Sequence, residues 1–80
     1  MDVRYLTKEE IKRMMDVDKT MAQLPKNLSK KIREEAVGDL YDPAFCRKHN
    51  LNYLKIRDTD FYITLEIVLE QHHITVNHLN

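Results

Sequence analysis

Cys46 and His49 have the strongest metal-binding chemistry in this sequence, and they stand three positions apart. Further along the chain, four residues separate His73 from His78. This layout resembles that of a Cys/His zinc site, in which four ligands surround the ion as a tetrahedron. Structural zinc sites in small domains usually hold two cysteines, however, and this chain has one. We therefore expect a buried cysteine with surface histidines, and neither a metal nor any other cofactor.

Cys46 and His49 could also act as a nucleophile and its general base on one face of a helix. No third side chain is predicted to orient the histidine, and a chain of this size is too small for a deep pocket. Gly38 is the only glycine, which excludes the glycine-rich loops that hold phosphates or dinucleotides. We expect no catalytic residue and no enzymatic activity.

Charge is balanced over the chain but segregated along it. Thirteen basic residues match thirteen acidic ones, so no general field favours binding to nucleic acid or membrane. Basic residues are grouped within 19–33 and again within 47–57. Such groups favour contact with an acidic partner or with phosphates. The predicted partner-binding residues are Lys30, Lys31, Arg33, Arg47, Lys48, Lys55 and Arg57.

The first strong structural signal is a helix start near the N-terminus. Thr7 followed by Glu10 is a capping box, so we expect a helix to begin at Lys8. Asp18 falls in the middle of the apolar stripe that follows. Either this helix ends near residues 16–18, or Asp18 faces a polar group.

Two more helices are predicted before residue 50. Asn27 or Ser29 can cap the second helix, and Gly38 is a candidate for its end. The apolar side of this helix comprises Leu28, Ile32, Ala36 and Leu40. Asp42-Pro43 predicts the N-cap and first position of a short third helix that ends near Asn50.

The C-terminal third fits two structures. Apolar residues alternate with others from Phe61 to Glu70, which is the period of a strand, with Tyr53–Arg57 as its hairpin partner and residues 58–60 as the turn. The competing interpretation is a helix capped by Asp58 or Thr59, which the scarcity of glycine favours. We predict a single α+β domain over residues 1–80, with two or three helices followed by a C-terminal β-hairpin. An all-α domain is the close alternative.

This element order resembles that of a winged helix-turn-helix domain, whose third helix enters the major groove while the hairpin contacts the DNA backbone. The resemblance would place Arg47, Lys48, Lys55 and Arg57 on DNA. Residues 19–25, Lys-Thr-Met-Ala-Gln-Leu-Pro, and 27–32, Asn-Leu-Ser-Lys-Lys-Ile, are similar to the strand and first helix of ribbon-helix-helix repressors. Either resemblance implies a sequence-specific transcriptional regulator.

No segment approaches the roughly 20 consecutive apolar residues needed to cross a bilayer, and a single cysteine suits a reducing compartment. We expect a cytoplasmic, non-catalytic regulatory or adaptor protein that binds another protein, with no membrane partner. The alternative function is the DNA-binding regulator. A net charge of zero and an exposed strand edge near residues 61–69 also favour self-association, for example as a homodimer.

Overall fold

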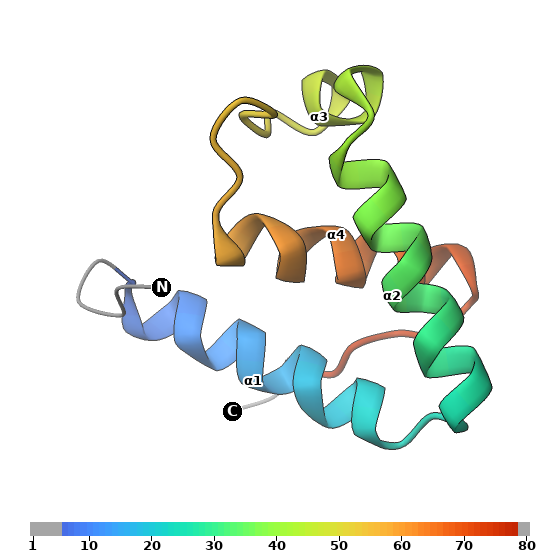
Figure 1. Ribbon diagram of the computed structural model, residues 1–80. Helices are drawn as coiled ribbons and strands as arrows, with labels where there is room; N and C mark the ends of the chain where they lie inside the picture. The colour runs from blue at the N-terminus through green and yellow to red at the C-terminus, as the bar shows by residue number, and fades with distance from the viewer. Residues whose placement is uncertain (1–5, 79–80) are drawn as a thin grey trace.

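The computed structural model describes residues 6–78, which form four helices and no strand. The helices are α1 (Lys8–Ala22), α2 (Lys26–Leu40), α3 (Pro43–Lys48) and α4 (Asp58–Gln71). α4 packs against both α1 and α2, while α3 and the loop after it form one end of the molecule (Figure 1). The domain is therefore all-α.

The predicted C-terminal hairpin is wrong, and with it the α+β fold class. Residues 53–57 form a turn and irregular backbone, and residues 58–71 form α4. The strand edge that favoured self-association is consequently absent from residues 6–78. The strands required by the two DNA-binding resemblances are also absent from residues 6–78. The hairpin of the winged helix is replaced by α4, and the residues similar to the ribbon strand lie in α1 (19–22) and in the turn after it (23–25).

The sequence of α4 is apolar on most sides, which explains why its period was ambiguous. In the helix, Thr64, Leu65, Val68 and Leu69 are buried, at the spacing of three and four that a helix brings to one face. Ile63 is 45% exposed. The alternating apolar residues therefore do not share a face, and packing follows the helical period instead.

The predicted start of α1 is confirmed. The Thr7 hydroxyl accepts a hydrogen bond from the Glu10 amide at 3.0 Å, and Glu10 Oε1 accepts from the Thr7 amide at 3.1 Å. The helix continues past Asp18 because Asp18 faces a polar group. The Tyr62 hydroxyl of α4 lies 2.9 and 3.1 Å from the two oxygens of the Asp18 carboxylate, to which it donates.

α2 differs from its prediction at both ends. It begins at Lys26 after Pro25, so neither Asn27 nor Ser29 caps it, and it runs through Gly38 to Leu40. Proline suits the N-terminal boundary because it fixes φ and has no amide to leave unpaired. The predicted apolar side is confirmed in that Ile32, Ala36 and Leu40 are buried, while Leu28 packs at the edge of the core.

The start of α3 is confirmed, since Asp42 Oδ1 accepts from the Ala44 amide at 3.0 Å and Pro43 is the first helical residue. Its C-terminal turn is closed by Asn50, whose φ is +58°. The Leu51 amide donates to the Cys46 carbonyl at 2.8 Å, which is the Schellman arrangement. His73, with φ +63°, closes α4 in the same way. Asn50 and His73 therefore occupy the left-handed positions at which glycine is common, and Gly38 does not.

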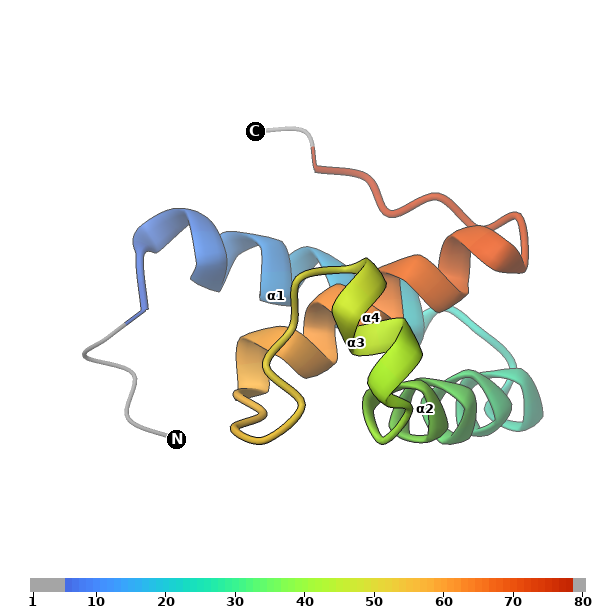
Figure 2. The same ribbon diagram turned by 90° about the horizontal axis from the view of Figure 1, so that it is seen from above.

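The core lies where α1, α2 and α4 meet. Its buried members are Val17, Met21, Ile32, Ala36, Leu65, Val68, Leu69 and Val76. Val76 belongs to the C-terminal segment, residues 74–78, which turns back after α4 and runs across the helices (Figure 2). This segment is therefore part of the packed domain.

Candidate functional site

The seven predicted partner-binding residues are all exposed, but they lie in two separate places. Lys30, Lys31 and Arg33 project from the first half of α2, whereas the other four follow α2, in α3 and the loop. The two groups are separated along α2, which at 15 residues is about 22 Å long. The structure thus replaces one predicted basic face with two distinct surfaces.

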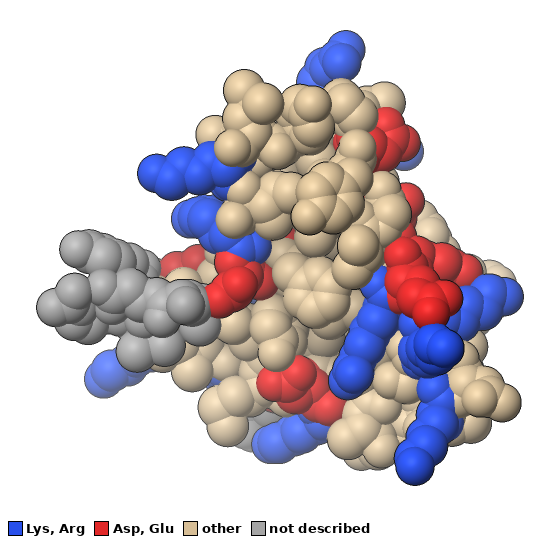
Figure 3. All heavy atoms as spheres, in the orientation of Figure 1, with Lys and Arg blue, Asp and Glu red and all other residues tan. Residues whose placement is uncertain are grey.

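The surface at the α3 end combines cations with exposed apolar side chains, and we call it the loop surface. Leu54 is 85% exposed and Tyr41 is 70% exposed, a large exposure for side chains of this size. On the face seen in Figure 3, this upper end is mostly uncharged, with Lys and Arg side chains at its top and left edges and Asp or Glu side chains at its right edge. The loop surface comprises Tyr41, Arg47, Lys48, Tyr53, Leu54, Lys55 and Ile56.

Local hydrogen bonds hold the loop in this shape. Asn52 Oδ1 accepts from the Leu54 amide at 3.1 Å, and the Asn52 carbonyl accepts from the Lys55 amide at 3.0 Å. This turn places Tyr53 and Leu54 at its two central positions, where both are exposed. A shallow pocket of about 330 Å³ lies between Tyr53, Leu54 and α3.

Three of the four predicted cations at this end have no ion pair within residues 6–78. They are Arg47, Lys48 and Lys55. Arg57 differs, because its guanidinium lies 3.3 Å from Asp60 Oδ1 and its backbone amide donates to Asp60 Oδ2 at 2.9 Å. Arg57 therefore stabilises the start of α4 and is less available to a partner.

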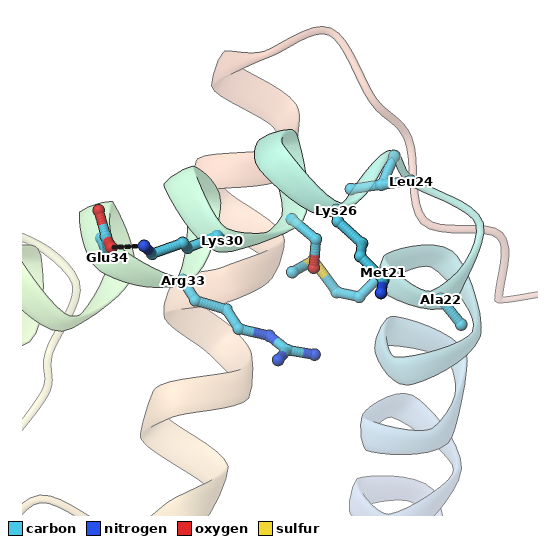
Figure 4. A pocket seen from close by; sticks show the side chains of 8 residues that line it. Met21, Ala22, Leu24, Lys26, Lys30, Arg33 and Glu34 are labelled. Carbon is cyan, nitrogen blue, oxygen red and sulfur yellow. Dashed lines mark ion pairs between the residues drawn. The ribbon is translucent and has the colours of Figure 1, made fainter.

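A second pocket, of about 380 Å³, lies between the end of α1 and the first half of α2 (Figure 4). Lys26 and Arg33 project toward it, while Lys30 turns away to Glu34, 3.9 Å distant. Lys31 does not line it. Lys26 was missed as a site residue, although the spacing i, i+4 and i+7 of Lys26, Lys30 and Arg33 predicts one shared helix face.

The Cys/His residues are not gathered. Cys46 is buried and donates from Sγ to the Leu40 carbonyl at 3.2 Å, and the His49 ring packs on Phe45 with centroids 4.4 Å apart. His73 is exposed beyond α4. No group of three or more His, Cys, Asp or Glu side chains in the described part of the chain is placed to hold a metal ion.

His78 instead joins a cluster that the sequence analysis missed. Its Nδ1 lies 2.9 Å from Asp16 Oδ2 in α1, and its Nε2 lies 2.7 Å from Glu66 Oε1 in α4. The ring donates to both carboxylates when both of its nitrogens carry protons, which is the imidazolium form. Lys12 donates to Asp16 at 2.9 Å and to the His78 carbonyl at 3.2 Å, and Arg13 lies 3.1 Å from Glu66.

The electrostatics of this cluster follow from its hydrogen bonds. Bonds to Asp16 and then to Glu66 raise the pKa of His78 above its ordinary value. The bonds from His78 and Lys12 lower the pKa of Asp16. Each group therefore stabilises the charged form of its neighbour, and the cluster fastens the C-terminal segment to α1 and α4.

Comparisons of this chain with protein-family models, curated proteins and solved structures gave no match. Within residues 6–78, no helix has both the length and the apolar character required to span a membrane. The loop surface and the pocket between α1 and α2 are the two candidate binding sites of the domain.

Proposed function

We propose that this domain is a non-catalytic binding module whose loop surface engages an acidic, apolar segment of another protein. The observation that carries the proposal is the exposure of Leu54, 85%, in an ordered turn near Arg47, Lys48 and Lys55, which form no ion pair within residues 6–78. Exposed apolar side chains gathered at one place on a small domain are typical of interaction sites.

The energetics favour a peptide with both apolar and acidic residues. Full burial of a leucine or aromatic side chain contributes about 1.5–3 kcal/mol, so Leu54 and Tyr53 can anchor a partner. Arg47, Lys48 and Lys55 would add selectivity and a faster encounter with an acidic segment rather than most of the affinity.

The chemistry of Cys46 supports a non-catalytic role. Its thiol is buried and already donates to the Leu40 carbonyl, and the neighbouring His49 ring packs on Phe45. A nucleophilic cysteine needs access to substrate and a base that takes its proton. We also propose a cytoplasmic location, which a single buried cysteine suits, and self-association, which a net charge of zero favours.

DNA binding is the second candidate, because Arg47 and Lys48 lie in the last turn of a helix that closely follows another helix. α3 has six residues and is thus about 9 Å long, which is short for a helix that must reach several bases. Asp39 and Asp42, on the chain just before α3, would also repel phosphates.

A defined peptide library tests the proposal. Peptides selected on the full chain should be enriched in Asp or Glu beside Leu, Phe or Trp, and their binding should shift the amide resonances of residues 41–56. Leu54→Ala should weaken a selected peptide by about 10-fold, since much of a leucine's burial energy is lost. The control is Lys31→Ala, an exposed cation that lies outside the loop surface, which should leave binding unchanged.

Two outcomes would contradict the protein-binding function. One is a library without enrichment. The other is tight, sequence-specific binding of a duplex, with an affinity that falls steeply with salt and weakens when Arg47 and Lys48 are replaced by alanine.

A further inference from the structure

The pocket between α1 and α2 lies at the opposite end of α2 from the loop surface (Figure 1). Its apolar part is formed by Met21, which is buried, and by Ala22 and Leu24 at the end of α1. Its polar rim comes from α2 and comprises Lys26, Ser29, Lys30, Arg33 and Glu34. The pocket therefore joins an apolar floor to a mainly basic rim.

Two of the rim cations are not in ion pairs with the residues that the structure describes. Lys26 and Arg33 form no ion pair among the described residues, and both project toward the pocket (Figure 4). Asp18 is an acid of α1 near this side, and it accepts the hydroxyl of Tyr62. Arg33 lies near enough to Tyr62 to oppose the rise in the pKa of that phenol, which burial and Asp18 cause.

We infer that this pocket is a second binding site, which takes a carboxylate adjacent to an apolar side chain in an acidic segment of a partner protein. The carboxylate meets Lys26 and the planar guanidinium of Arg33, which suits carboxylate geometry. The neighbouring apolar side chain covers Met21 and Leu24. The site is separate from the loop surface, so the domain can hold two segments at once, as a protein that links partners must.

The surrounding charges favour a peptide over a nucleic acid. Glu34 stands on the rim itself, and Glu35 and Asp39 follow on the same helix. A phosphate chain places a charge at every nucleotide and would meet Glu34 on the rim. A peptide can present one carboxylate to Lys26 and Arg33 and an apolar group to the floor.

The test is a titration of the isotopically labelled full chain with short blocked peptides that pair Glu with Leu. Saturable shifts should appear in residues 21–34. Lys26→Ala and Arg33→Ala should each weaken binding by about 10-fold, because each removes a charge-assisted hydrogen bond. Lys31→Ala is the matched control on the same helix and should have no effect. Far-ultraviolet circular dichroism checks that each variant is folded.

Three further measurements test which groups of the peptide are recognised and whether the two sites bind independently. Replacing Glu with Gln, or Leu with Ser, in the peptide should weaken binding, and a Leu54→Ala protein should keep the shifts in residues 21–34. The inference is overturned if residues 21–34 do not respond, if the Gln peptide binds equally well, or if a duplex or inorganic phosphate gives the same shifts at the same concentration. If peptides fail to bind at the loop surface but shift residues 21–34, the proposed function is contradicted and the inference about this pocket is supported.

Discussion

The side of the molecule formed by α1, α4 and the C-terminal segment uses its charges differently from the side formed by α2 and α3. On the first side, five charged residues form one connected cluster with contacts of 2.7–3.2 Å. Its members are Lys12, Arg13, Asp16, Glu66 and His78. On the second side, the cations without an ion pair within residues 6–78 are Lys26, Lys31, Arg33, Arg47, Lys48 and Lys55.

This difference separates stabilising charges from charges available to a partner. Asp16 is buried and the Glu66 side chain is only 19% exposed, so these two carboxylates are less hydrated than those at the surface, and their hydrogen bonds to His78 hold the C-terminal segment on the core. The Lys30–Glu34 pair has side chains 78% and 68% exposed, and such pairs contribute little. The binding surfaces therefore lie where charge adds little to folding.

The largest expected effect on stability comes from removing a carboxylate from the His78 cluster. Glu66→Gln removes the carboxylate shared by His78 and Arg13 and should lower the free energy of unfolding by about 1–2 kcal/mol. Glu34→Gln breaks the exposed pair of α2 and should change it by less than about 0.5 kcal/mol. Urea denaturation measures both variants. Equal losses would show that the two sides do not differ as the geometry indicates.

The paired cluster could not be read from the sequence, because its members are far apart along the chain. His78 and Asp16 are 62 positions apart, and no local pattern links residues at that distance. Asp18 was recognised as an anomaly, but its partner Tyr62, 44 positions away, was equally hidden. By contrast, the capping box at Thr7 and the N-cap at Asp42 depend on contacts over two or three residues, and both were predicted.

The fold class failed at α4 for a different reason. Both faces of residues 61–69 are rich in apolar residues, so a strand period and a helical period fit the same sequence. The decision comes from packing, because α4 fills the space between α1 and α2 with Leu65, Val68 and Leu69. The predicted end of α2 at Gly38 was also wrong. A glycine within a helix and a glycine just after a helix cannot be distinguished by sequence alone, because the difference lies in the backbone conformation.

The second prediction concerns the pH dependence of the stability that the His78 cluster contributes. The pKa of His78 is raised above its ordinary value by Asp16 and Glu66, so its stabilising contribution is complete below about pH 6.5 and is lost as pH rises through the raised pKa. The lowered pKa of Asp16 acts at the other end, where stability falls as pH drops through it. The charged groups that face His78 are Lys12 and Asp16 of α1 and Glu66 of α4, with Arg13 behind Glu66.

Melting temperature should therefore fall as pH rises through the raised pKa of His78, with loss of amide protection in residues 74–78. His78→Gln should be less stable than the parent at about pH 6 and should lose this fall. His73→Gln is the matched control on the neighbouring exposed histidine and should keep it. A His78 resonance that titrates below its ordinary pKa would refute the imidazolium assignment.

The smallest expected effect is an increase in the free energy of unfolding from a substitution in α2. Gly38 lies within α2 with no atom within 4 Å of the position that a Cβ would take. Gly38→Ala should therefore raise the free energy of unfolding by up to about 1 kcal/mol, because alanine restricts the unfolded chain and favours helix. Ala36→Gly, at a buried position of the core-facing stripe two residues earlier in the same helix, should have the opposite sign. If Gly38→Ala also leaves peptide binding at both surfaces unchanged, the stability of α2 and the use of its charges are independent. A loss of binding would instead show that Gly38 contributes to a partner contact.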